Sequence, residues 1–157
     1  MTVADRVGAI DIGTNSVLLL IAEARGGGLV PVLELATVTR LGEGVDRTRH
    51  LDAAAIERTL ACLADYGRAL REHGVSRVDA VGTSAMRDAG GGDAFRLRAG
   101  EILGVDPRAI GGDEEARLSF EGALDGIEVP GDALVFDIGG GSTELVLGRG
   151  ADITSAM

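Results

Sequence analysis

Asp11-Ile12-Gly13-Thr14-Asn15-Ser16 and Asp137-Ile138-Gly139-Gly140-Gly141-Ser142 are two copies of one short pattern. Each copy follows an apolar run and leads into another, with a leucine at the same offset, Leu19 and Leu145. An apolar run, a glycine-containing turn and a returning run together predict a β-hairpin. A repeat in this register therefore indicates two hairpins that carry the same chemical groups.

The residue types in these loops suit an anion. Glycine permits positive φ and lets backbone N–H groups converge without a Cβ in the way, and a following hydroxyl adds a donor. The anion would repel Asp11 and Asp137 unless they bind a cation or orient water, so the pattern indicates a phosphate site linked to Mg²⁺. The alternative is two ordinary hairpins. The expected phosphate-binding residues are Gly13, Thr14, Asn15, Ser16, Gly139, Gly140, Gly141 and Ser142.

The rest of the chain predicts an α/β fold. Three apolar runs, 7–11, 17–24 and 29–39, are joined by short turns and predict an antiparallel three-strand meander. Apolar residues at helical spacing predict a helix between an N-cap at Asp52 and a C-terminal Gly74. Strands then alternate with helices, which predicts a mixed sheet with helices on its faces. The later strands are expected at 77–81, 109–110, 133–137 and 142–147, with a further hairpin from 149, and the later helices at 93–103 and from an Asp113 cap to 124.

Composition narrows the class of protein. The 157 residues suit one domain, 1–157, and include a single cysteine, Cys62, expected to be a buried thiol. The formal net charge is −10, which argues against non-specific nucleic-acid binding but not against a small anionic substrate. The longest apolar stretch, 17–22, is too short to span a bilayer, and the N-terminus lacks a signal pattern. We expect a cytoplasmic protein with no membrane partner.

Three further charged groups are candidates for the site. Glu144 shares a strand face with Ser142, so it joins the loop if that face points inward. Glu114 and Glu115 open a helix, where acids either favour the helix dipole or supply a general base. Arg87 follows a buried strand and suits forked contacts with phosphate, the alternative being a salt bridge to Asp88.

The sequence resembles the exopolyphosphatase and guanosine-pentaphosphate phosphohydrolase family. Four motifs in order, spread over nearly the whole chain, carry the resemblance. They are Ala9-Ile10-Asp11-Ile12-Gly13-Thr14-Asn15-Ser16, Gly82-Thr83-Ser84-Ala85-Met86-Arg87-Asp88-Ala89, Gly112-Asp113-Glu114-Glu115-Ala116-Arg117-Leu118 and Val135-Phe136-Asp137-Ile138-Gly139-Gly140-Gly141-Ser142-Thr143-Glu144-Leu145. The paired Asp-Ile-Gly loops are less specific, because the wider actin, sugar-kinase and heat-shock ATPase superfamily also has them.

This resemblance implies a ribonuclease-H-like domain and a hydrolase that releases terminal orthophosphate from inorganic polyphosphate or guanosine pentaphosphate. It implies Mg²⁺ as cofactor, with Asp11, Asp137 and Glu144 as the carboxylates near the metal. Glu115 would be the base on water, Asp137 and Glu144 would help to handle metal and water, and Arg87 would contact phosphate. Relatives often form dimers, so a homodimer is compatible with the resemblance.

Two departures and two alternatives accompany the resemblance. Gly90-Gly91-Gly92 stands where relatives carry bulkier polar residues, and relatives have a second actin-like domain that would follow Met157. We therefore expect a fragment that is only weakly active alone, because closure of the cleft aligns the substrate. The first alternative is a kinase or ATPase domain of the same superfamily. The second is a non-catalytic sensor of guanosine polyphosphates.

Overall fold

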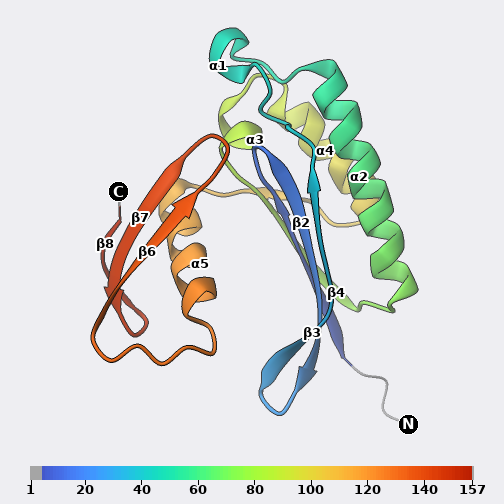
Figure 1. The fold of residues 1–157 in the computed structure, drawn as a ribbon. Helices are drawn as coiled ribbons and strands as arrows, with labels where there is room; N and C mark the ends of the chain where they lie inside the picture. The colour runs from blue at the N-terminus through green and yellow to red at the C-terminus, as the bar shows by residue number, and fades with distance from the viewer. Residues whose placement is uncertain (1–4, 157) are drawn as a thin grey trace.

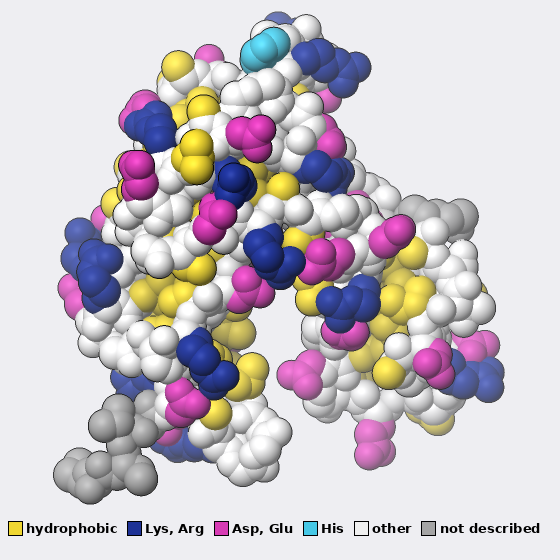
Figure 2. Space-filling view, turned by 180° about the vertical axis from the view of Figure 1, so that it is seen from behind, with side chains coloured by type: hydrophobic (Ala, Val, Ile, Leu, Met, Phe, Trp, Pro, Cys, Tyr) yellow, Lys and Arg dark blue, Asp and Glu magenta, His cyan; other side chains and the backbone are white. Residues whose placement is uncertain are grey.

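A computed structural model describes residues 5–156, which form two lobes side by side (Figure 1). The N-terminal lobe, residues 5–110, contains a five-stranded sheet in the order β3-β2-β1-β4-β5. The C-terminal lobe, residues 111–156, contains a three-stranded sheet in the order β6-β7-β8. Figure 2 shows a notch between the lobes, with acidic and basic side chains where they approach each other.

The first sheet confirms the predicted mixed sheet with its meander. β1, β2 and β3 are antiparallel neighbours, whereas β1, β4 and β5 are parallel. Because β1 and β4 are parallel, their carboxyl ends meet at one edge of the sheet, where sites form in α/β folds. The strands are β1 (Arg6–Ile12), β2 (Ser16–Arg25), β3 (Gly28–Val38), β4 (Arg77–Gly82) and β5 (Arg108–Ala109).

Two long helices, α2 (Ala53–Glu72) and α4 (Gly92–Leu103), cover one face of this sheet, and the other face is turned toward the C-terminal lobe (Figure 1). The predicted caps of α2 are confirmed. The carboxylate of Asp52 accepts hydrogen bonds from the amides of Ala54 and Ala55 at 2.9 and 3.1 Å, and Gly74 has a φ of 63°. The buried core includes Ile10, Ile12, Val17, Leu19, Leu63, Phe95 and, as expected, Cys62.

The C-terminal lobe has a hydrophobic core of its own. Helix α5 (Gly112–Leu124) packs on β6 (Asp132–Ile138), β7 (Thr143–Arg149) and β8 (Asp152–Ala156). Phe120 and Val146 lie at its centre, and a Cβ on Gly148 would lie 2.7 Å from the Phe120 ring. The hairpin predicted to begin at 149 is confirmed as the β7–β8 pair.

Some elements differ from the prediction. The repeat hairpin β6–β7 belongs to a separate sheet. The sequence did not predict this separation, because apolar alternation does not reveal which sheet a hairpin joins. Asp113 was predicted to cap α5, but the cap is Gly111 and Asp113 lies in the first turn. Two helices, α1 (Val45–Thr48) and α3 (Ser84–Asp88), were not predicted, because helices this short do not contain enough residues to show an apolar periodicity. No helix within residues 5–156 has both the length and the apolarity needed to cross a membrane.

Candidate active site

The two repeated loops face each other across the notch, and both turns close in the same way. The amide of Gly13 donates to the Ser16 carbonyl at 2.9 Å, and the amide of Gly139 donates to the Ser142 carbonyl at 3.0 Å. A Cβ on Gly140 would lie 2.6 Å from the Cβ of Asn15. Glycine is therefore required at position 140 for the loops to come this close.

Together the loops line a cavity of about 370 Å³. All eight loop residues predicted to bind phosphate contribute to its wall, as do the carboxylates of Asp11, Glu115, Asp137 and Glu144. The cavity also includes Leu18, Ile138 and Thr83, which the sequence did not single out. Thr83 follows the end of β4, so the parallel pairing of β4 with β1 was the signal that could have located it.

A backbone strap after β3 fixes the direction of the first loop. The Asn15 carbonyl accepts hydrogen bonds from the amides of Thr39 and Arg40 at 3.0 and 2.8 Å, and the Thr14 carbonyl accepts one from Gly42 at 2.9 Å. A trans peptide points its N–H away from its C=O. The amides of Asn15 and Ser16 therefore point away from the strap, which keeps them free of the bonds that hold the loop.

Hydroxyl groups support the same cavity from behind. Thr14 Oγ1 lies 2.8 Å from Ser84 Oγ on α3, within hydrogen-bond distance. A Cβ on Gly141 would lie 2.9 Å from that Ser84 Oγ and 3.0 Å from Thr14 Oγ1. The second loop thus rests on a hydroxyl pair from the N-terminal lobe.

The carboxylates come from both lobes. Asp11 lies on β1 and Asp137 on β6, and Glu144 is the register partner of Asp137 on β7. Ser119 on α5 donates a hydrogen bond to Asp137 Oδ2. Asp11 Oδ1 is buried and has no hydrogen-bond partner among residues 5–156. Burial raises the pKa of Asp11 above its ordinary value, and the nearby charge of Asp137 raises it further.

Glu115 projects from the first turn of α5 to the wall of the cavity, and its side chain is only 13% exposed. Burial is the main cause that raises its pKa, and the negative charges of Glu144, Asp11 and Asp137 act in the same direction. Arg87 opposes them, because its Nη1 lies 3.7 Å from Glu115 Oε2. A half-buried carboxyl with a raised pKa has the character of a general base.

Arg87 lies behind this carboxyl and does not line the cavity itself. Its Nε and Nη2 both donate to Asp88 at 2.9 Å, which is the salt bridge that the sequence left as an alternative. Its Nη1 donates to the Ile110 carbonyl at 2.8 Å. In this arrangement Arg87 interacts with Glu115 as an ion pair.

This chain has an α/β fold in which two facing Asp-Ile-Gly hairpins line one cavity, and its relatives can now be compared with it. The model of the Ppx/GppA phosphatase family matches residues 20–157, and the chain belongs to that family. Exopolyphosphatase 2 of Mycobacterium tuberculosis is 43% identical over 155 residues, which cover 92% of this chain and 48% of that protein.

Solved structures show the same fold. An exopolyphosphatase-like protein superposes with a TM-score of 0.92 at 37% identity, over 98% of this chain and 50% of that one. The Ppx/GppA family member of Aquifex aeolicus gives 0.85 at 35% identity, over 99% and 51%. At 13% identity, the ethanolamine utilization protein EutJ of Carboxydothermus hydrogenoformans shares the fold alone, with a TM-score of 0.54 over 97% of this chain and 50% of that one. The chain spans about half the length of the relatives it matches.

Proposed function

We propose that this protein provides the phosphate-binding and water-activating part of an enzyme that releases terminal orthophosphate from inorganic polyphosphate. The observation that carries the proposal is the position of Glu115, a largely enclosed carboxyl with a raised pKa in the wall of a cavity formed by the two repeated loops. Its relatives include exopolyphosphatases, which supports the choice of substrate.

The loops bind the terminal phosphoryl group. Their amides and hydroxyls are donors on opposite walls of one cavity, so they surround the phosphoryl oxygens. Because those donors are already in place, they stabilise the charge of the transferring group with little reorganisation, which is the main source of catalysis in phosphoryl transfer.

Glu115 then accepts a proton from the attacking water. The water oxygen forms a bond to the terminal phosphorus, and the bridging P–O bond on the opposite side breaks. The electron pair leaves with the shortened chain. Asp137 and Glu144, which face each other across β6 and β7, orient the water. Arg87 lowers the pKa of Glu115, which favours its ionised form, and is a positioning residue.

Mg²⁺ fits the residues present. Among the described residues, no three carboxylate, histidine or cysteine side chains converge to enclose a cation. Mg²⁺ needs no such cage, because it commonly uses one or two carboxylates together with waters and substrate phosphates. Asp11, with a buried oxygen that has no donor, would hold it with Asp137 or Glu144. The ion would supply charge neutralisation on the phosphate oxygens.

Guanosine pentaphosphate is the second candidate substrate. The family description includes GppA, and a terminal phosphoryl group on a nucleotide has the same chemistry as the end of polyphosphate. The test is release of orthophosphate by the protein from each substrate, with and without Mg²⁺. Release from polyphosphate supports the proposal, and release from ATP but from neither of these substrates favours a superfamily ATPase. Tight binding of guanosine pentaphosphate with no release from any substrate favours a sensor.

A further inference from the structure

A second, smaller cavity of about 160 Å³ adjoins the two loops. Thr14, Asn15 and Gly140 line both this cavity and the larger one, so the two spaces share a wall at the point where the loops meet. The remaining lining residues, Arg40, Gly42 and Glu43, belong to the strap that holds the first loop. An anion bound between the loops therefore has a neighbouring space beside it, and Arg40 belongs to the wall of that space.

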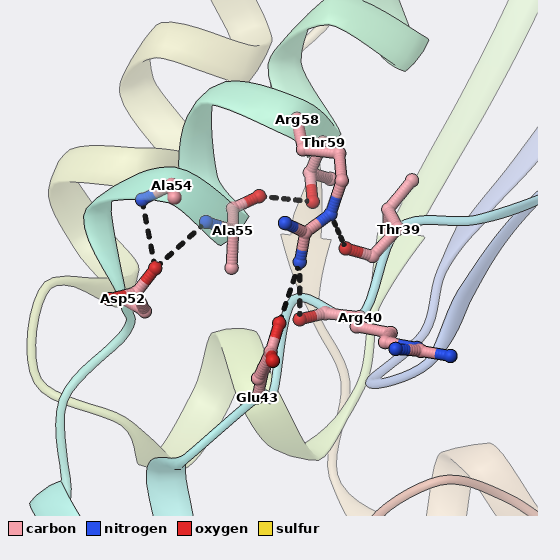
Figure 3. A network of polar contacts seen from close by, with 8 residues as sticks. All are labelled: Thr39, Arg40, Glu43, Asp52, Ala54, Ala55, Arg58 and Thr59. Atoms are coloured by element: carbon pink, nitrogen blue, oxygen red, sulfur yellow. Dashed lines mark hydrogen bonds and ion pairs between the residues drawn. The ribbon is translucent and has the colours of Figure 1, made fainter.

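The polar network around Arg58 includes the backbone carbonyl of Arg40 but not its guanidinium (Figure 3). Arg58 Nε donates to the Thr39 carbonyl at 2.5 Å, and its Nη2 lies 3.0 Å from Glu43 Oε2. The charge of Glu43 is thus balanced by its ion pair with Arg58. The side chain of Arg40 extends away from both, and no carboxylate of residues 5–156 lies within ion-pair distance of it (Figure 3). In a chain of net charge −10, such an arginine beside a phosphate loop is available to a ligand.

The backbone of Arg40 is held in an unfavourable conformation. Its φ is 52°, in the left-handed region that non-glycine residues seldom adopt. Arg49, with a φ of 59°, ends helix α1, where this conformation is common, but Arg40 ends no helix. Its amide is fixed to the Asn15 carbonyl at 2.8 Å, so the strain persists at the point of contact with the first loop. Retained strain of this kind is a feature of ligand-binding positions.

We propose that Arg40 and this cavity bind a second phosphoryl group, adjacent to the one that the loops hold. The inference rests on the proposed function, since it assigns the next unit of the same phosphoanhydride chain to the space beside the loops. Arg40 then selects a chain of phosphates over free orthophosphate. This makes it a specificity-determining residue, with a guanidinium suited to forked contacts with phosphate oxygens.

The test is calorimetric binding of orthophosphate and of tripolyphosphate to the protein in the presence of Mg²⁺. Arg40→Gln is expected to weaken tripolyphosphate binding about tenfold, the loss that a charge-assisted hydrogen bond implies, while orthophosphate binding changes little. Arg40→Lys should recover part of the affinity. Arg71→Gln is the control: it removes the same charge in the last turn of α2, and it should alter the affinity for neither ligand.

A glycine variant separates binding from folding. Gly suits the φ of 52°, so Arg40→Gly is expected to melt at or above the wild-type temperature and still to lose tripolyphosphate affinity. Equal loss for both ligands, no loss for either, or equal affinity of the wild type for the two ligands would each overturn the inference. Wild-type protein that releases no phosphate from tripolyphosphate contradicts the proposed function instead, and the binding comparison still decides the role of Arg40.

Discussion

Arg87 on α3 and Glu115 on α5 bring the two lobes into contact, with 3.7 Å between the guanidinium Nη1 and the carboxylate Oε2. The pair crosses the notch beside the cavity, and each side chain has a different role in it. Glu115 lines the cavity, whereas Arg87 stands behind it and lowers the pKa that burial raises. The pKa of the proposed base, which burial raises most, is therefore lowered in part by a residue from the opposite lobe.

Glu115→Gln is expected to reduce phosphate release from polyphosphate by about 10²- to 10⁴-fold, the usual range for loss of a general base. Binding of tripolyphosphate should persist, because the loops are intact. Glu114→Gln is the matched control: Glu114 is the adjacent residue, and it pairs with Arg108 at the surface at 3.0 Å. That variant should retain the wild-type rate. A Glu115→Gln enzyme with the wild-type rate would remove Glu115 from the mechanism.

The pH dependence of the rate should respond in opposite directions to two substitutions. A base acts when ionised, so the rate falls as pH falls through the pKa of Glu115. Arg87 lowers that pKa and Glu144 raises it. Arg87→Gln should therefore move the acidic limb of the pH–rate profile to higher pH, and Glu144→Gln should move it to lower pH. Arg87→Lys should leave the limb near its wild-type position, and shifts of the same sign in both Gln variants would contradict this account.

The loops were predictable from the sequence because each is a local pattern. Strand, glycine turn and strand occur within a few residues, and the repeat of Asp11 to Ser16 at 137–142 indicated that the two act together. The cap of α2 at Asp52 was predictable for the same reason. These features depend on neighbours in the chain.

The relations between distant segments were not predictable from local patterns. Nothing local placed Glu115 against the loops, and only the family resemblance singled it out from Glu114 as the base. Thr83 and Arg40 reach the site through β4–β1 pairing and through the strap, which are both long-range contacts. The five residues of α3 have no apolar period, so neither this helix nor the direction of Arg87 could be derived.

Gly140→Ala should separate the two loops. The added Cβ would lie 2.6 Å from that of Asn15, and the backbone there does not have a positive φ, so the effect is steric. Overpacking of this kind costs about 1–3 kcal/mol, and phosphate affinity measured by calorimetry should fall with stability. Gly122→Ala is the control in the same lobe. It meets nothing within 4 Å inside helix α5, and alanine should raise stability by about 0.5–1 kcal/mol.

Asp11→Asn should stabilise the metal-free protein and remove its response to Mg²⁺. Burial and Asp137 raise the pKa of Asp11, so the native state binds its proton more tightly than the unfolded state does. Stability from this group is present at low pH and is lost as pH rises through its folded pKa. Asparagine cannot ionise, so the variant should melt about 2–4 °C higher at neutral pH if roughly 1 kcal/mol is recovered.

With tripolyphosphate present, adding Mg²⁺ should raise the melting temperature of the wild type, because a ligand bound at 100 times its Kd stabilises by about 2.7 kcal/mol. Asp11→Asn should show little of this rise, since the buried oxygen that lacks a donor no longer carries charge. Asp132→Asn removes an exposed carboxylate that pairs with Arg149, and it should respond to Mg²⁺ as the wild type does. An equal Mg²⁺ response in the Asp11 and Asp132 variants would exclude Asp11 as a metal ligand, and the orphaned oxygen would then need another partner.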